Sequence, residues 1–177
     1  MISDDQLNLV IGLIFSMPLS EILRALPPGL IRHIYSLVLG TALQIFVFGY
    51  DVWMAFLLHT LIYVILRVRA KKCGALITTL SLLILSVFHI YRMVMDYGGW
   101  KMDLSTILMT IVCKYSMLAY AVEDGVNENR KLSPEQESNK IESVPSFFHF
   151  LSYCLFLPTC IMGTAIEYKR FDAYMKK

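Results

Sequence analysis

Charged residues are scarce in this sequence. Asp, Glu, Lys and Arg make up 17% of the 177 residues, against about 25% in an average soluble domain. Hydrophobic residues reach 56%, which indicates that the chain folds in a membrane. The formal net charge is only +2, and the basic residues cluster in loops instead of forming one face. We therefore expect no nucleic-acid partner.

Motifs for metal binding and for secretion are also missing. The cysteines, Cys73, Cys113, Cys154 and Cys160, form no CxxC pair and have no histidine at zinc-finger spacing. We expect them to be small core residues, and we expect no metal site. The start of the chain, Met1-Ile-Ser-Asp-Asp, lacks the basic region and cleavage site of a signal peptide. The first apolar segment is therefore expected to stay in the mature protein.

Long apolar runs, separated by short polar turns, fill most of the chain. A helix needs about 20 residues to cross a hydrocarbon core of roughly 30 Å. We predict an all-α fold, a polytopic transmembrane helical bundle with about six membrane segments in a single domain, residues 1–177. The predicted segments are 7–26, 30–48 (or from 34), 52–68, 74–91, 104–122 and 144–166. The last is interrupted by Pro145, Pro158 and Gly163, so we predict a broken helix whose freed backbone groups are satisfied by protein or a cavity.

The polar stretch 123–143 is predicted to be a cytoplasmic loop, in which Ser133 caps a short helix with Pro134 at its first position. With six crossings, the positive-inside rule puts the N-terminus in the lumen. A re-entrant last segment would move the C-terminal tail to the cytoplasmic side. The predicted cytoplasmic loops hold Arg24, Arg32, Arg67, Arg69, Lys71, Lys72, Arg130, Lys131 and Lys140, and the opposite side holds Arg92, Lys101, Lys169, Arg170, Lys176 and Lys177.

Lys114 lies in the middle of the apolar run 104–122. A lysine at the centre of a membrane helix costs about 2.5–3.5 kcal/mol on insertion scales. We therefore predict that its ammonium faces the interior of the bundle or a water-filled hollow. There it either pairs structurally or holds a phosphate or carboxylate group.

Three blocks of residues occur in order over about ninety residues of the chain. The first is Phe88-His89-Ile90-Tyr91-Arg92 with Tyr97-Gly98, and the second is the run 104–122 with Lys114 and the ending Asp124-Gly125. The third joins Leu132-Ser-Pro-Glu-Gln136, the stretch from Pro145 to Tyr153, Gly163, Tyr168-Lys169 and Phe171. Together they resemble the membrane-bound O-acyltransferase family, in particular its lysophospholipid acyltransferase branch.

The sequence departs from the family pattern at three points. The family usually has Glu where this chain has His149, and Pro where it has Thr164. The family's catalytic histidine commonly lies in a Trp-His-Gly context, but Trp53 is followed by Met and Trp100 by Lys. The resemblance therefore implies the N-terminal portion of such an enzyme, part of a larger fold, without its catalytic histidine or the partner of that histidine.

The resemblance implies acyl transfer from a coenzyme A thioester to the free hydroxyl of a lysophospholipid. It also implies a role in phospholipid remodelling and a location in the endoplasmic reticulum. A base must take the proton of the hydroxyl as it attacks, and a dry tunnel must exclude water from the thioester. We expect this chain to supply tunnel walls and to be inactive alone. No bound cofactor is expected. The expected partners are membrane lipids, lysophospholipid, acyl-CoA as co-substrate, and the missing C-terminal half of the enzyme.

We consider five residues as candidate substrate contacts: His89, Arg92, Lys114, Tyr153 and Tyr168. Each also has a structural interpretation, such as a snorkelling arginine, an interfacial histidine or tyrosine, or a paired lysine. His59 and His149 are expected to be hydrogen-bonded structural residues. The basic residues from Arg67 to Lys72 are a topology signal or attract anionic headgroups or coenzyme A phosphates. The alternative function is a non-enzymatic module that binds lipid or partners, or a small transporter-like bundle.

Overall fold

The computed structural model describes residues 4–95, 97, 104–127, 131–161 and 164–177. All regular elements in these ranges are helical, which confirms the predicted all-α class. The α-helices are α1 (Asp4–Ala25), α2 (Leu30–Phe48), α3 (Val52–Val68), α4 (Gly74–Met95), α5 (Leu104–Val126), α6 (Pro134–Asn139), α7 (Phe147–Cys154) and α8 (Tyr168–Lys176). Short 3₁₀ turns are η1 (Gly49–Asp51), η2 (Ala70–Lys72) and η3 (Leu157–Thr159).

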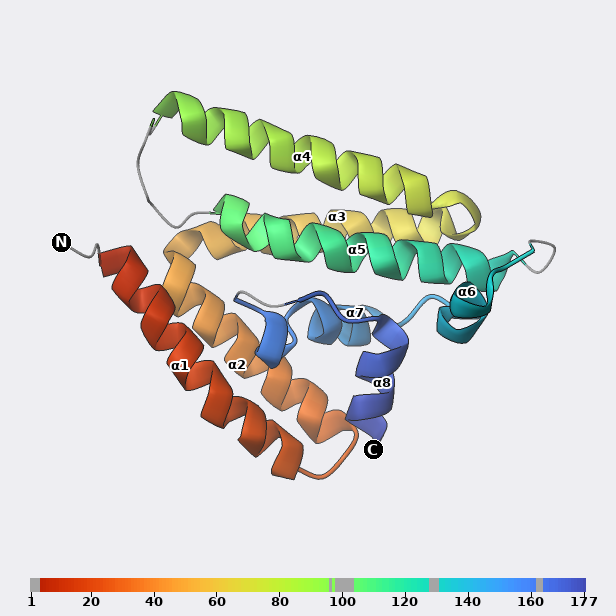
Figure 1. Ribbon diagram of the computed structural model, residues 1–177, viewed down its shortest axis with the longest axis horizontal. Coiled ribbons are helices and arrows are strands. Elements are labelled where there is room, and N and C mark those ends of the chain that lie inside the picture. The colour runs from red at the N-terminus through yellow and green to blue at the C-terminus, as the bar shows by residue number, and fades with distance from the viewer. Residues whose placement is uncertain (1–3, 96, 98–103, 128–130, 162–163) are drawn as a thin grey trace.

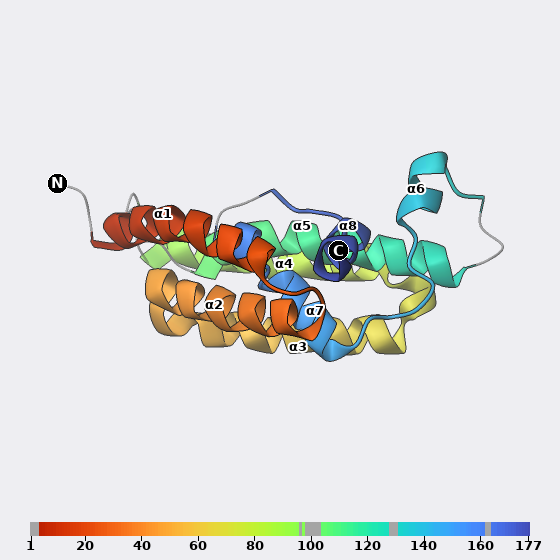
Figure 2. The ribbon, with the colours of Figure 1, turned by 90° about the horizontal axis from the view of Figure 1, so that it is seen from below.

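The long helices form two antiparallel pairs, α1 with α2 and α4 with α5, and α3 packs against α5 (Figure 1). Seen from below, α2 and α3 lie in one layer and α1 and α5 in another, while α6 projects from one end (Figure 2). The short helix α7 contacts α2 and α3. The centre of the bundle is therefore occupied by a segment from the last third of the chain.

Two glycines set the turns that begin and end α2. Gly29 has a φ of 103° and Gly49 a φ of 63°, values in the left-handed region that other residues rarely adopt. Gly29 follows two prolines, which cannot continue α1 into α2. The predicted loop between the first two segments therefore has a direct backbone cause.

By length and composition, the described residues contain four candidate membrane spans, at Gln6–Ala25, Leu30–Val68, Gly74–Met95 and Ser105–Val126. The second is 39 residues long, about twice the length that crosses a bilayer, and contains both α2 and α3. These spans thus correspond to the first five predicted segments. The many exposed leucine, isoleucine and valine side chains on them suit a lipid environment.

The sixth predicted segment, 144–166, is broken as expected. It contains α7, of 8 residues, and the turn η3, and it provides no candidate span. Eight helical residues rise only about 12 Å, well short of the hydrocarbon core. Its helix α7 enters the bundle but is too short to cross a membrane.

The chain then returns to the end of the bundle from which it came. In α8, the carbonyl oxygen of Met175 accepts a hydrogen bond of 2.9 Å from the backbone N–H of Gly29, in the α1–α2 loop. The Lys169 ammonium donates to the Ser138 carbonyl oxygen at 2.6 Å, and Asn139 Nδ2 donates to Glu167 at 2.6 Å. These contacts agree with the re-entrant alternative for residues 144–166, which we call the re-entrant segment; the side of the membrane on which the tail lies stays a prediction.

In this arrangement the basic residues of α8 lie at the same end of the bundle as the α1–α2 and α5–α6 connections. Among the described residues outside the bundle interior, Arg92 is the one lysine or arginine at the other end, where α4 ends. The described basic residues are thus concentrated at one end of the bundle.

The short helix α6 begins as the sequence predicts. The Ser133 hydroxyl accepts a hydrogen bond from the Gln136 backbone N–H at 3.3 Å, and the Gln136 side-chain oxygen accepts one from the Ser133 N–H at 2.9 Å. This reciprocal pair is a capping box, and Pro134 occupies the first helical position.

Candidate functional site

Lys114 lies inside the bundle, as predicted, and its side chain is fully buried. Its ammonium donates to the carbonyl oxygen of Cys154 at 2.9 Å and to that of Tyr153 at 3.4 Å. These carbonyls belong to the last turn of α7, where helical backbone leaves acceptors unsatisfied and the helix dipole favours a cation. Lys114 therefore caps α7 from the neighbouring helix α5.

The face of α2 that meets the re-entrant segment is polar. Ser36 accepts a hydrogen bond from the Leu157 N–H at 3.1 Å, and Gln44 donates to the Cys160 carbonyl at 2.9 Å. Positions four apart share a helix face, so Ser36 and Gln44 point the same way, with Gly40 between them. Their side chains satisfy backbone groups that the broken helix leaves free, as the sequence led us to expect.

Gly40 lets the two backbones meet. A Cβ atom at this position would lie 2.1 Å from the carbonyl oxygen of Leu155, far inside van der Waals contact. Any larger residue at Gly40 would push the re-entrant segment away from α2. The close approach between α2 and this segment thus depends on the absence of a side chain at Gly40.

Two of the candidate substrate contacts, Tyr153 and Tyr168, lie next to Lys114 in an aromatic cluster. The Lys114 ammonium is 5.8 Å from the centre of the Tyr153 ring, within the range of cation–π attraction. The Tyr153 hydroxyl donates to the Ile166 carbonyl at 2.6 Å, and the ring packs against Tyr168 and Phe171 with centroids 5.4 Å apart in each case. The structure therefore brings Lys114, Tyr153 and Tyr168 together.

His89 and Arg92, by contrast, lie on α4, which is on the opposite side of α5 from α7 (Figure 1). Both side chains are partly exposed. The spacing of three residues does put them on one helix face. The structure does not bring this pair into the cluster around Lys114.

The two histidines that we expected to be structural are hydrogen-bonded. His59 is fully buried on α3, and its Nδ1 lies 2.5 Å from the Tyr115 hydroxyl of α5. His149 Nδ1 lies 2.6 Å from the hydroxyl of Ser146, the residue that caps α7. Neither arrangement presents a base to a substrate cavity.

Arg32, which the sequence analysis counted only among the charges of the predicted cytoplasmic loops, is buried in the first turn of α2. Its guanidinium donates to the carbonyl oxygens of Leu26 at 2.9 Å, Tyr174 at 2.8 Å and Arg24 at 3.1 Å. It thereby joins the end of α1 to α8. The signal in the sequence was a polar stripe on α2, because Arg32, Ser36 and Gln44 recur at intervals of four or eight in an otherwise apolar helix.

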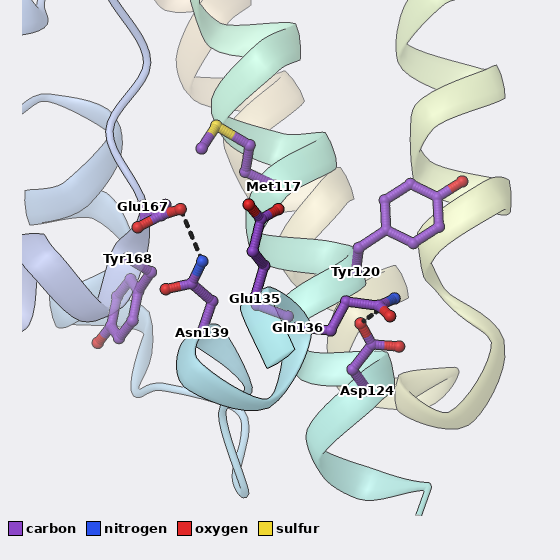
Figure 3. Close-up of a pocket in the computed structure, with 9 residues that line it drawn as sticks. Met117, Tyr120, Asp124, Glu135, Gln136, Asn139, Glu167 and Tyr168 are labelled. Atoms are coloured by element: carbon purple, nitrogen blue, oxygen red, sulfur yellow. Dashed lines mark hydrogen bonds between the residues drawn. The ribbon is translucent and has the colours of Figure 1, made fainter. Parts of the chain in front are cut away.

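A cavity of about 220 Å³ lies between the end of α5, helix α6 and the start of α8 (Figure 3). It is lined by Met117, Tyr120, Ala121, Asp124, Glu135, Gln136, Asn139, Glu167 and Tyr168. Gln136 donates to the Asp124 carboxylate at 3.1 Å. Because three carboxylates line the cavity, it suits a cationic or hydroxyl-bearing group and repels phosphate. Tyr168 belongs both to the cavity lining and to the aromatic cluster.

Within the described ranges, no group of three or more His, Cys, Asp and Glu side chains could hold a metal ion. The cluster around Lys114 likewise lacks a free base beside a nucleophile. The printed contacts of Lys114 are structural, to the backbone carbonyls at the end of α7.

These observations define an all-helical membrane bundle with a re-entrant segment held by a buried lysine. No family model matches the chain. It is 27% identical to lysophospholipid acyltransferase 6 of Drosophila melanogaster, over 99% of this chain and 25% of that protein. It is 28% identical to membrane-bound glycerophospholipid O-acyltransferase 2 of Mus musculus, over 97% of this chain and 35% of that protein.

A third relative, the lysophospholipid acyltransferase of Schizosaccharomyces pombe, is 26% identical over 97% of this chain and 34% of its own length. The resemblance to membrane-bound lysophospholipid acyltransferases is thereby confirmed, and it extends over nearly the whole chain. The chain spans about a quarter to a third of the length of these relatives.

Proposed function

We propose that this chain is the N-terminal portion of an acyl-CoA-dependent lysophospholipid O-acyltransferase. The observation that carries the proposal is the similarity of 97–99% of the chain to only 25–35% of acyltransferases from fly, mouse and fission yeast. The chain supplies part of the wall around the substrates, and the catalytic histidine comes from the remainder of the enzyme.

The contacts of the re-entrant segment support a role as a wall. Side chains of α2 and α5 hold its backbone from both sides, through Ser36, Gln44 and Lys114. A fixed wall is what acyl transfer needs, since a shift of about 1 Å in a bound substrate can cost a hundredfold in rate. Tyr168, which lines the cavity beside α5 and α6, would face the acyl chain or glycerol backbone of a bound lysophospholipid, with the Tyr153 ring packed against it.

The proposed reaction joins two substrates. The hydroxyl oxygen of the lysophospholipid attacks the thioester carbon of acyl-CoA, an ester bond forms, the carbon–sulfur bond breaks, and coenzyme A leaves as the thiol. The base that accepts the hydroxyl proton is outside this chain. His89 and Arg92, near the C-terminal end of α4, would contact a lipid phosphate.

We further propose that the protein lies in the endoplasmic reticulum membrane with its N-terminus in the lumen. The distribution of basic residues supports this orientation, because the loops at the α1–α2, α3–α4 and α5–α6 connections and helix α8 share one end of the bundle. That end would face the cytoplasm. Acyl-CoA, a cytosolic substrate, would then approach the end that bears the 123–143 loop.

The test compares the chain alone with a completed enzyme. Membranes containing the 177-residue chain are assayed with radiolabelled oleoyl-CoA and lysophosphatidylcholine, lysophosphatidylethanolamine or lysophosphatidylserine. We expect no transfer above control membranes. Fusing the chain to the unmatched C-terminal part of the fly acyltransferase should produce activity, and the same part expressed without this chain should not.

The outcomes separate the two functions. Robust turnover by the chain alone would show that its catalytic base has been overlooked. A fusion that inserts and folds but has no activity with any acceptor would favour the non-enzymatic lipid- or partner-binding module. Transcript sequencing gives an independent check, since the proposal expects the reading frame to continue beyond Lys177 into a Trp-His-Gly motif.

A further inference from the structure

Four basic residues lie within six positions, from the last turn of α3 to the turn η2 before α4. These are Arg67, Arg69, Lys71 and Lys72, which we call the basic run. All four are exposed. Within the described ranges none of them forms an ion pair.

The backbone that carries the basic run is held firmly against α5. The Asn127 side-chain amide donates to the Lys71 carbonyl at 2.9 Å, and the Cys73 thiol donates to the Ala119 carbonyl at 3.2 Å. The Gly74 N–H donates to the Glu123 carboxylate at 2.7 Å, at the start of α4. The backbone of the turn is therefore fixed, and the entropic cost of binding is limited to ordering the four side chains.

The position of the turn fixes its depth in a membrane. It connects the candidate span that ends at Val68 to the one that begins at Gly74, so the basic run lies where hydrocarbon gives way to headgroups. Lipid phosphates and carboxylates are concentrated at this level.

We propose that the basic run is a binding site for anionic phospholipid headgroups of the adjacent leaflet. The four cations gather phosphatidylserine-type lipids around the α3–α4 turn, and the negative headgroups neutralise charges that the protein leaves unpaired. This inference depends on the fold alone, and it stands whether or not the chain is part of an acyltransferase.

The test measures lipid selectivity directly. The full chain is reconstituted into dioleoylphosphatidylcholine vesicles, and electron spin resonance gives the protein-bound fraction of spin-labelled phosphatidylserine and of spin-labelled phosphatidylcholine. The wild type should prefer phosphatidylserine by roughly three- to tenfold at low salt. The preference should fall toward one in the variant R67Q/R69Q/K71Q/K72Q, and also in about 0.5 M NaCl.

The control variant K131Q/R170Q/K176Q/K177Q removes four other exposed charges. It should keep most of the preference, whereas equal loss in both variants would show that net charge and not the basic run is responsible, overturning the proposal.

Millimolar coenzyme A is added as a soluble polyphosphate. If it abolishes the preference at constant ionic strength, the run binds soluble phosphates and the lipid assignment is wrong. A wild type without preference also overturns it.

Discussion

The ammonium of Lys114 lies 2.9 Å from the carbonyl oxygen of Cys154, 40 residues further along the chain. Lys114 of the long helix α5 thereby caps the C-terminal end of α7, where a buried carbonyl without a donor would be costly. A lysine in lipid and an unpaired helix end in a dry interior each cost free energy, and the hydrogen bond between them lowers both costs.

Replacing Lys114 with Met should destabilise the bundle and loosen α7. Methionine matches the length of lysine but donates no hydrogen bond, so the Tyr153 and Cys154 carbonyls would be left buried without this donor. We expect a loss of about 1–3 kcal/mol. Thermal unfolding in detergent gives the change, and hydrogen exchange should rise in residues 150–157. The exposed Lys131→Met is the control, and equal exchange in K114M and wild type would contradict the capping role.

Much of this bundle could be predicted from the sequence because each membrane span is defined by the residues of that stretch alone. The segments 30–48 and 52–68 agree with α2 and α3, and the predicted Ser133 cap is present. Hydropathy and capping depend on neighbouring residues, so they can be read from a single chain. The segments 74–91 and 104–122 were each four residues too short at the end.

Other features could not be predicted, because they depend on contacts between distant parts of the chain. The sequence placed Lys114 in the interior but left open whether it pairs structurally or binds a ligand. The side of the membrane on which α8 lies depends on hydrogen bonds between Met175 and Gly29 and between Lys169 and Ser138. The spacing of Ser36 and Gln44 indicates a polar face on α2, but the sequence does not show which backbone groups this face contacts.

Replacing Gly40 with Ala should destabilise the protein even though alanine is the better helix former. The added methyl group would lie 2.1 Å from the Leu155 carbonyl oxygen, so α2 and the re-entrant segment must separate. Overpacking of this kind costs about 1–3 kcal/mol, more than the roughly 1 kcal/mol gained from helix propensity. The unfolding midpoint in detergent should fall. Thr41→Ala, at the next position, should change it little, and a midpoint raised by G40A would show that the close approach is absent.

The stability of the protein should fall at alkaline pH because of Cys73. Burial, aided by the nearby Glu123 carboxylate, raises the pKa of this thiol from its ordinary value of 9.0 to about 11. The folded state keeps the proton longer than the unfolded state. This contribution is therefore fully present below about pH 9 and is lost as the pH rises toward 11.

The measurement compares the unfolding midpoints of wild type and Cys73→Ser at pH 8 and pH 10.5. Serine keeps a hydroxyl that can donate to the Ala119 carbonyl, as the thiol does, but it does not titrate in this range. The wild type should lose more stability than C73S between the two pH values. Identical losses would show that the thiol ionises equally easily in both states.

Segment 144–166 should bring the C-terminal helix back to the side of the 123–143 loop. Single cysteines at Lys140, Lys177 and Asp51, in a chain whose native cysteines are replaced, report the two sides of the membrane. In sealed microsomes, a membrane-impermeant maleimide should label K140C and K177C from the same side, because α8 is tied to Ser138 and Gly29. It should reach D51C, in the α2–α3 turn, only after the membrane is opened. If K177C behaves like D51C, the segment crosses the membrane and the hydrogen bonds from α8 to both loops cannot exist in the bilayer.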